Sequence, residues 1–386
     1  MPRVLLAAAL WASAATLAMA QDRPEWHWNA DANAFFGFNY QQRKFTDFSA
    51  WESQNWIMAG TERRSSRDRF RAGAMLSFEP FTLMDTGSPQ VFQTGETFNN
   101  APLIDYQHPH DLIMGLGADY QGRVGLVTVL AGADLVGSPT IGPMPFMHRP
   151  SAVENPQAPL SHHNMDSTHI THGVVRGGVG LGSWRLEGSW FHGQEPDEDR
   201  LDLDLGKLDS YAARISWTRG PWYAQVSAAH LTQPERLNPF DAERITASVA
   251  RDSADPERGL SWLAAFGQNR EIHGNLEAYL VEGTLRLSSV NVMYWRAESV
   301  AKDILDAGFH PNFFHLHRQS QVGAFTAGYV RTLLRTPAGS FGIGGDLTAY
   351  AVPDNLREGY GSPLSFHLFL RYRAPSVSRQ GQVHVH

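Results

Sequence analysis

The sequence has no cysteine in its 386 residues, and this absence excludes disulfide bridges, thiolate metal sites and cysteine nucleophiles. An excess of positive charge is also lacking, because 32 Lys and Arg stand against 39 Asp and Glu. This balance argues against a nucleic-acid partner. No Walker, dinucleotide-binding or kinase motif is present. Beyond residue 20 there is no apolar run of about 18 residues, so the sequence provides no transmembrane helix.

The first twenty residues have the three parts of a secretory signal peptide. Met1-Pro2-Arg3 is a short basic start, Val4 to Leu17 is apolar, and Ala18-Met19-Ala20 is a small-x-small cleavage site. We therefore predict that residues 1–20 are removed and that the mature chain begins at Gln21. An exported chain without an apolar helix can span a membrane only as a β-barrel.

Apolar and polar residues alternate with period two along most of the mature chain, which is the pattern of β-strands with one apolar and one polar face. In segment 29–40 one face carries Ala30, Ala32, Ala34, Phe36, Phe38 and Tyr40, and the other carries Asn29, Asp31, Asn33, Phe35, Gly37 and Asn39. Segments 70–79, 211–218 and 341–350 repeat this alternation. Because sustained 3.6-residue periodicity is absent, the sequence predicts an all-β protein.

These segments have the length, about ten residues, of a tilted strand that crosses a bilayer. Their apolar faces often end in an aromatic residue, as in the interfacial belts of outer-membrane barrels: Tyr40, Trp184, Trp190, Trp217, Trp222, Tyr329 and Tyr372. The opposite faces carry charges, which are costly toward lipid and reasonable toward a wet lumen. The predicted lumen-lining residues are Arg71, Glu79, Arg176, Arg185, Glu187, Arg214, Glu282, Arg286 and Asp346. A secreted, soluble β-sandwich is the alternative, since its strands also alternate.

The connections between these segments alternate between short turns and long loops. Tight turns are predicted at 65–68, 120–123, 182–183, 219–221, 288–289 and 336–339. Long loops are predicted at 41–52, 84–110, 135–168, 193–208, 232–241, 268–275, 299–320 and 351–363. The fold class indicated is a transmembrane antiparallel β-barrel of about 16 strands (14–18), with short periplasmic turns and long extracellular loops. The barrel is expected over residues 21–373, and a polar tail over 374–386 follows it.

Three of the predicted extracellular loops are rich in the chain's 17 histidines. Imidazoles together with carboxylates suit borderline metals such as Zn²⁺ or Cu²⁺, and Met144, Met147 and Met165 lie nearby in sequence as soft ligands. The candidate metal ligands are His108, His110, Asp111, His148, His162, His163, Asp166, His169 and His172. The seventh loop adds His310, His315 and His317. The alternative is that these side chains pack the loops or line a polar pore, since no His-Glu-x-x-His motif occurs.

Four stretches carry specific motifs: Phe92-Gln93-Thr94-Gly95-Glu96, Gln107-His108-Pro109-His110-Asp111-Leu112, Phe146-Met147-His148-Arg149-Pro150-Ser151-Ala152, and Pro159-Leu160-Ser161-His162-His163 running into Asp166-Ser167-Thr168-His169-Ile170. On these motifs the chain resembles an uncharacterised family of Gram-negative outer-membrane β-barrel proteins, continuously from about residue 70 to 180. The resemblance implies a barrel in the bacterial outer membrane and carries no activity with it. Asn164 and Met165 depart from the family pattern, which more often has Trp and a polar residue there.

Three functions from different classes fit these features. A sixteen-strand barrel encloses an aqueous lumen, so we expect a channel for passive or gated passage of small polar solutes or ions, narrowed by inward-folded loops. Such a channel has no catalytic residues, and a divalent metal (Cu or Zn) is its only possible cofactor. A rim-sited hydrolase is the rival, using Ser161, His162, His163, Asp166, Ser167 or His169, although no nucleophile-elbow motif supports it. A non-transporting structural barrel is the third possibility.

Overall fold

The computed structural model describes residues 25–272, 274–308 and 318–375. The predicted signal peptide and the tail beyond residue 375 lie outside the described residues, as do His310, His315 and His317. Within the described ranges no helix is both long enough and apolar enough to cross a membrane.

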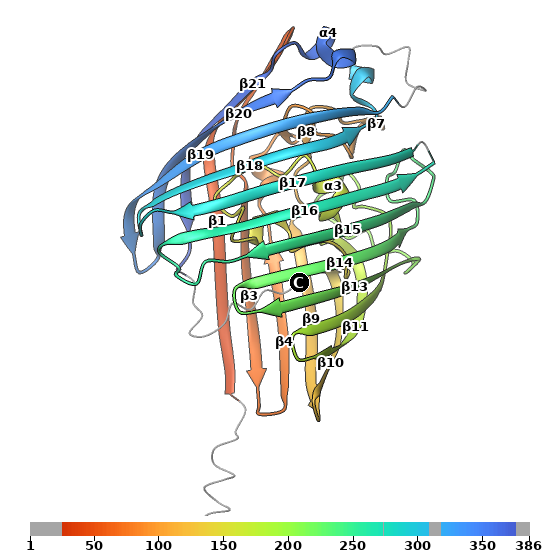
Figure 1. The fold of residues 1–386 in the computed structure, drawn as a ribbon, viewed down its shortest axis with the longest axis vertical. Helices are drawn as coiled ribbons and strands as arrows, with labels where there is room; N and C mark the ends of the chain where they lie inside the picture. The colour runs from red at the N-terminus through yellow and green to blue at the C-terminus, as the bar shows by residue number, and fades with distance from the viewer. Residues whose placement is uncertain (1–24, 273, 309–317, 376–386) are drawn as a thin grey trace, which may run out of the picture.

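Antiparallel strands form one closed barrel, shown from the side in Figure 1. The first strand closes it, because β1 pairs with β21 along one edge and with β2 and β3 along the other. Since β2 and β3 lie end to end along β1, the 17 strands of the sheet occupy sixteen positions. This confirms the predicted all-β barrel and its strand number, and the soluble sandwich is wrong.

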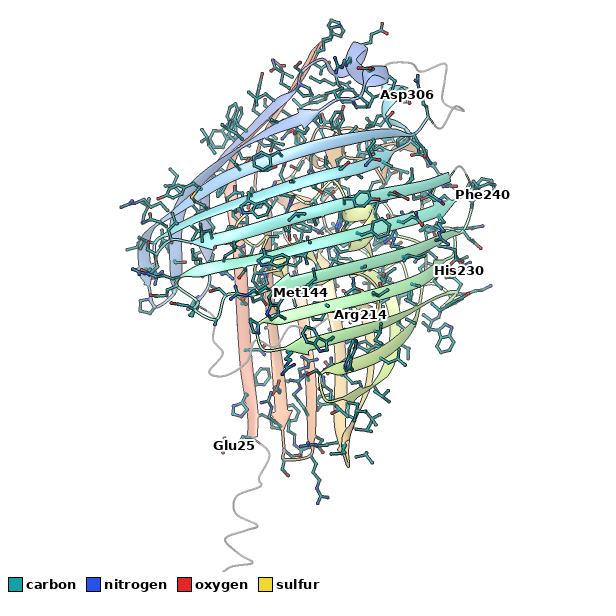
Figure 2. The ribbon with its side chains drawn as sticks, in the orientation of Figure 1. Glu25, Met144, Arg214, His230, Phe240 and Asp306 are labelled. Atoms are coloured by element: carbon teal, nitrogen blue, oxygen red, sulfur yellow. The ribbon has the colours of Figure 1, made fainter. Side chains whose placement is uncertain are left out.

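The remaining strands pair in chain order around the barrel. The strands of the wall are β1 Glu25–Arg43, β2 Thr46–Glu52, β3 Asn55–Arg64, β4 Asp68–Leu76, β9 Ile113–Val124, β10 Val127–Gly137, β11 Thr171–Leu181, β12 Trp184–Phe191, β13 Ser210–Arg219, β14 Trp222–Leu231, β15 Ala242–Arg251, β16 Gly259–Glu271, β17 Gly274–Arg286, β18 Asn291–Lys302, β19 Ser320–Thr336, β20 Gly339–Ala351 and β21 Leu364–Arg373. Figure 2 shows Glu25 at the end of the barrel where the short turns lie and Asp306 at the end where the long loops lie.

The two faces of the wall differ as the alternation predicts. In β1 the inward side chains of Asn33, Phe35 and Asn39 are buried, whereas the outward ring of Phe36 is 54% exposed. In β4 the inward side chain of Met75 is buried in the same way, whereas the outward ring of Phe70 is exposed. Apolar side chains therefore cover the outside of the barrel, and polar side chains are enclosed by it, which is the arrangement of a barrel in lipid.

The predicted loop 41–52 is wrong. β1 continues to Arg43, pairs there with Thr46 at the start of β2, and leaves only residues 44–45 as the turn. The polar composition of this segment resembles a loop, but Gln41 faces the interior, is fully buried, and accepts a hydrogen bond from Ser365 Oγ at 2.7 Å. A polar residue on the inner face of a barrel strand is thus easily mistaken for a loop residue.

Two further boundaries are wrong for related reasons. Most of the predicted loop 268–275 belongs to strands, because β16 continues to Glu271 and β17 begins at Gly274. Asn269, which resembles a loop residue, is an inward strand residue that forms hydrogen bonds. The predicted turn 120–123 lies within β9, and the real turn is 125–126, where Gly125 has a φ of 62°. Gly122 is a strand residue paired with Asp68, not a turn glycine.

Two long loops fold into the barrel and fill it. Loop 77–112 contains α2 Glu79–Thr82 and the short strands β5 Ser88–Pro89, β6 Thr97–Phe98, β7 Ala101–Pro102 and β8 Tyr106–Gln107. Loop 138–170, called the plug below, contains η1 Phe146–His148, α3 His162–Met165 and η2 Ser167–His169. Nearly all plug side chains are buried. In Figure 1 α3 is visible behind β16 and β17, and it contacts β15, β16 and β17. At the loop end lie η3 Leu305–Gly308, η5 Asp354–Leu356 and α4 Arg357–Tyr360.

The outward face of β21 provides a test of what surrounds the barrel. Leu368 is 62% exposed near the middle of the strand, and Leu364 is 48% exposed at its loop end. If lipid covers this face, Leu368→Arg lowers the free energy of unfolding in a bilayer by about 2–4 kcal/mol, whereas Leu364→Arg at the interface costs about 0–1 kcal/mol. Denaturant titration in liposomes measures both, and equal small losses would contradict a lipid-facing wall.

Candidate functional site

A buried charge cluster attaches the plug to the barrel wall. Arg149 of the plug donates from Nε to Glu282 of β17 at 2.8 Å and from Nη1 to Asp166 at 2.6 Å. Glu282 also accepts from Arg296 Nε of β18 at 3.1 Å. Each of these four side chains is at most 3% exposed. Charges that are removed from water persist only when they are paired in this way, so the cluster fixes the plug against β17 and β18.

A second carboxylate on the wall holds the segment before α3. Glu298 of β18 accepts hydrogen bonds from the backbone N–H of Leu160 at 3.1 Å and of Ser161 at 3.0 Å. It also accepts from Ser161 Oγ at 2.8 Å. On the other side of α3, Asn269 of β16 donates to the carbonyl oxygen of His163 at 3.1 Å. α3 is therefore tied to the wall just before its first residue and at its second residue.

The hydroxyl groups of this region do not form a hydrolase triad. Ser161 Oγ donates to Glu298, and Ser167 Oγ donates to Glu195 at 3.1 Å. Neither serine hydrogen-bonds to a histidine among the residues that the structure describes, although His162 and Asp166 are paired at 2.8 Å. A serine nucleophile requires a histidine base within hydrogen-bond reach. The geometry therefore does not support the predicted rim hydrolase.

Five histidines from the two inward loops form a closed ring, called the histidine ring below. The distances between successive ring centroids are 6.4 Å for His108–His110, 5.3 Å for His110–His169, 5.1 Å for His169–His162, 5.4 Å for His162–His163 and 6.0 Å for His163–His108. The Phe146 ring packs against His110 and His162 at 6.2 and 5.5 Å. Imidazoles far apart in the sequence thus meet at the α3 end of the plug.

Four members of the ring have Nδ1 engaged by an acceptor. His110 Nδ1 lies 2.7 Å from Glu79 Oε2, and His162 Nδ1 lies 2.8 Å from Asp166 Oδ1. His169 Nδ1 lies 2.8 Å from the Asp166 carbonyl oxygen, and His108 Nδ1 lies 3.0 Å from the Pro109 carbonyl oxygen. An acceptor at Nδ1 fixes the tautomer that carries its lone pair on Nε2, as is usual for metal-binding histidines. Among the described residues, the buried Nε2 atoms of His110, His163 and His169 have no hydrogen-bond partner.

The protonation states also suit ligand chemistry. Burial, and then Arg200 nearby, lowers the pKa of His108 well below its usual range. Burial lowers the pKa of His162 and His169 in the same direction. Burial alone would raise the pKa of Asp166, but Arg149 and His162 beside it hold that pKa well below its usual range. Neutral imidazoles with an ionised carboxylate behind them are the form that binds a metal ion.

One part of the ring has a carboxylate that sequence reasoning missed. Ligand atoms of Glu96, His108 and His163 all lie within 4.8 Å of one another, and His108 Nε2 is 2.9 Å from Glu96 Oε1. The preceding Gly95 has a φ of 122°, and a Cβ there would lie 2.5 Å from Cγ of His163. Because Gly95 has no Cβ, loop 77–112 can approach the imidazole of His163 closely. The signal in the sequence is the Phe92–Glu96 motif, which ends in this carboxylate.

The other predicted metal ligands are not members of the ring. His148 packs against the indole of Trp56 with centroids 4.6 Å apart. His172 accepts the backbone N–H of Asp204 at Nδ1, 2.8 Å away. Asp111 forms an ion pair with Arg200 at 3.2 Å. Asp166 contacts two ring members, as described above. Of the nine predicted ligands, the structure therefore brings five imidazoles together and places Asp166 behind them.

Most of the predicted lumen-lining charges are found in ion pairs on the inner wall, but Glu79 lies in α2 of the inward loop 77–112 because β4 ends at Leu76. Arg71 pairs with Asp119 at 2.9 Å, Arg176 with Asp134, and Arg214 with Glu187 at 3.3 Å. Arg185 lies 3.8 Å from Glu187. Glu79 supports His110, and Glu282 binds Arg149. Asp346 accepts from Tyr294 Oη at 2.7 Å and pairs with His367 at 2.7 Å, while Arg286 is half-buried. These charges stabilise the wall and the plug, in addition to any contact with water.

Two cavities of about 320 Å³ each lie on opposite sides of this site. The loop-side cavity is lined by His163 and Asn164 together with residues of the long loops. The turn-side cavity is lined by Asp166 and His169 together with Arg149 and Arg214. In Figure 2 the labelled Met144 and Arg214, which line this second cavity, lie within the outline of the barrel. The segment 163–169 therefore separates the two cavities.

Solved structures with the same architecture are outer-membrane porins. An anion-selective porin from Comamonas acidovorans has a TM-score of 0.52 and 11% identity over 90% of this chain and all of that chain. Salmonella typhi OmpF, in a complex with daunomycin, has a TM-score of 0.54 and 8% identity over 90% and 97%. Pseudomonas putida OprB, in a high-pH structure, has a TM-score of 0.54 and 10% identity over 94% and 96%. At this identity the likeness concerns the fold alone.

No protein-family model matches the chain, and no curated protein matches it. The resemblance to an uncharacterised outer-membrane family therefore stays a prediction. The class of structure defined by the fold is the sixteen-strand porin-type barrel, and the filled interior with its histidine ring is the feature from which a function must be inferred.

The Arg149 cluster predicts a large loss of stability when its central charge is removed. Arg149→Met leaves Asp166 and Glu282 buried with fewer partners, so the free energy of unfolding falls by about 3–5 kcal/mol. Arg185→Met is the matched control, because Arg185 is 43% exposed and lies 3.8 Å from its partner, and exposed pairs contribute about 0–1 kcal/mol. Denaturant unfolding compares the two variants, and similar losses would contradict the role of Arg149.

Proposed function

We propose that the protein is a channel in the outer membrane of a Gram-negative bacterium, for passive or gated passage of small polar solutes or ions. The observation that carries the proposal is the pair of cavities in a porin-type barrel, separated by segment 163–169 of the plug. An apolar outer wall supports the membrane location, and the porin architecture of the similar structures agrees with it. Because the plug is held by buried charges, we expect a narrow passage, not an open pore.

The charges of the loop-side cavity favour cations. Its acidic lining residues are Glu96, Glu195, Asp197, Glu235, Glu271, Asp303 and Asp306, against Arg236 and Lys302 as the lining Lys and Arg residues. Burial, reinforced by the neighbouring carboxylates Glu271 and Glu195, raises the pKa of Glu235 well above its usual range. A cleft with charges of one sign concentrates ions of the other sign. Small cations that enter from the loop side thus meet the histidine ring next.

The ring itself supports binding of a borderline divalent metal, Zn²⁺ or Cu²⁺. Neutral imidazoles are good ligands for both ions, and Glu79 and Asp166 supply the acceptors that orient them. The carboxylate of Glu96 beside His108 and His163 offers an oxygen ligand at the edge of the loop-side cavity. A cation could therefore move from an oxygen-rich mouth to nitrogen ligands inside the barrel.

Conductance tests the channel. The purified, folded barrel in a planar bilayer is expected to show small unitary currents carried by cations, because the plug leaves only narrow spaces and the loop-side mouth is acidic. Glu96→Gln together with Asp306→Asn lowers the permeability ratio of cation over anion, measured by the reversal potential in a salt gradient. A correctly folded barrel without conductance would instead favour a structural, non-transporting role.

Metal analysis tests the ring. A combined His108→Ala, His110→Ala, His169→Ala variant is expected to lose Zn²⁺ or Cu²⁺ that the unchanged protein retains after dialysis, because it lacks three of the five imidazoles. His230→Ala is the control, since His230 lies on the wall at the edge of the barrel in Figure 2 and pairs with Glu243 at 2.7 Å. Equal metal content in all three proteins would refute metal binding by the ring and would leave the channel untouched.

A further inference from the structure

Three methionines from three neighbouring strands gather on the inner wall beside the histidine ring. Met58 of β3 and Met75 of β4 are direct partners in the strand register. Met114 of β9 joins them, and the three side chains are 6%, 7% and 3% exposed. Four of the ten residues in this buried cluster are methionines, counting Met147, whereas the whole chain of 386 residues has 10. Thioethers are therefore concentrated at this place.

A β-bulge brings the third methionine into the group. Met75 pairs with Gly115, and Leu76 pairs with Ile113, so Met114 is skipped in the ladder between β4 and β9. Such an irregularity interrupts the alternation of side chains and redirects one of them. Bulges of this kind are frequent beside functional sites. Here the redirected side chain is a sulfur ligand that becomes buried.

The methionines line a small cavity of about the size of one ion. Met58, Met75, Met114 and His169 line a cavity of about 20 Å³, and a single water needs about 10–15 Å³. Asp134 and Arg176, which are paired with each other, complete its polar side. Thioether sulfurs are only weak hydrogen-bond acceptors, so this wall is a poor site for water. Methionine side chains that serve only to pack a core normally fill such a space themselves, because they are flexible. The cavity left between these three therefore favours a ligand.

A histidine nitrogen at the cavity lacks a partner. His169 is 7% exposed, its Nδ1 is engaged by the Asp166 carbonyl oxygen, and its buried Nε2 has no hydrogen-bond partner among the described residues. A buried polar atom without a partner is unfavourable unless a ligand occupies its lone pair. Three thioethers with one imidazole are a soft ligand set, which prefers Cu⁺ over Zn²⁺.

We propose that Met58, Met75, Met114 and His169 form a binding site for a soft monovalent metal ion, Cu⁺ or Ag⁺, next to the histidine ring. The site extends the proposed metal-binding function and shares His169 with it. It is nevertheless distinct in ligand chemistry, because sulfur selects soft ions whereas the ring with Glu96 suits borderline divalent ones. The ion binds without a change of oxidation state, and its positive charge lies close to the Asp134 carboxylate.

Silver provides the test, because Ag⁺ is soft and needs no reductant. Purified protein in detergent is titrated with Ag⁺ and, separately, with Zn²⁺. The expected result is that the Met58→Leu, Met75→Leu, Met114→Leu variant loses tight Ag⁺ binding and retains Zn²⁺, since Leu conserves volume at these sites. Met293→Leu is the control, because Met293 is 47% exposed on the outer wall. The His108→Ala, His163→Ala variant should show the reverse, with Zn²⁺ lost and Ag⁺ retained.

The outcomes separate the two proposals. Unchanged Ag⁺ binding in the methionine variant, or no Ag⁺ binding by the unchanged protein, would overturn the soft-metal site. If the unchanged protein binds Ag⁺ but not Zn²⁺, divalent metal binding by the histidine ring is refuted and the soft-metal site is supported. If the methionine variant does not fold, X-ray absorption of the Ag⁺-loaded unchanged protein decides: sulfur ligands support the site, and a shell of only nitrogen and oxygen refutes it.

Discussion

The interior of this barrel depends on the buried ion pairs that the Arg149 guanidinium forms with Glu282 and Asp166. A sixteen-strand barrel is wide enough to hold water, yet here the plug occupies it because Arg149 is held between Glu282 of the wall and Asp166 of the plug itself. Asp166 in turn contacts His162 and His169. One chain of charged and polar contacts therefore runs from the wall, through the plug, to the imidazoles, and the position of the histidine ring follows from it.

The fold was predictable because period-two alternation is a local property of the sequence. The alternation of their immediate neighbours is enough to place Phe36 on the outer face and Asn39 on the inner face. The barrel and its strand number follow from counting such segments. The errors fell where inward polar residues such as Gln41 and Asn269 resemble loop residues. A barrel encloses polar side chains, so polarity alone does not separate strand from loop. The site was only partly predictable, since the contacts that arrange it join distant segments.

Particular partners illustrate this limit. The motif histidines were recognisable by their spacing, but nothing in the sequence connects His108 with Glu96 and His163, which meet only when the two loops are folded inside the wall. The same holds for Met114, whose burial depends on a register shift between β4 and β9. His148 of the plug and His172 of β11 were equally recognisable, but each has a partner outside the ring, Trp56 and Asp204 respectively.

The closure of the barrel has a consequence for the order in which the protein can be assembled. β1 completes its pairing only with β21, the last strand, and the plug draws its wall partners from β17 and β18, far later in the chain than the plug itself. The N-terminal half of the chain therefore finds neither its edge partner nor its anchoring carboxylates until the last strands are available. Such long-range pairing makes folding slow and leaves early segments exposed to aggregation. The chain accordingly needs protection in transit, and any truncation before residue 364 leaves it with two open edges.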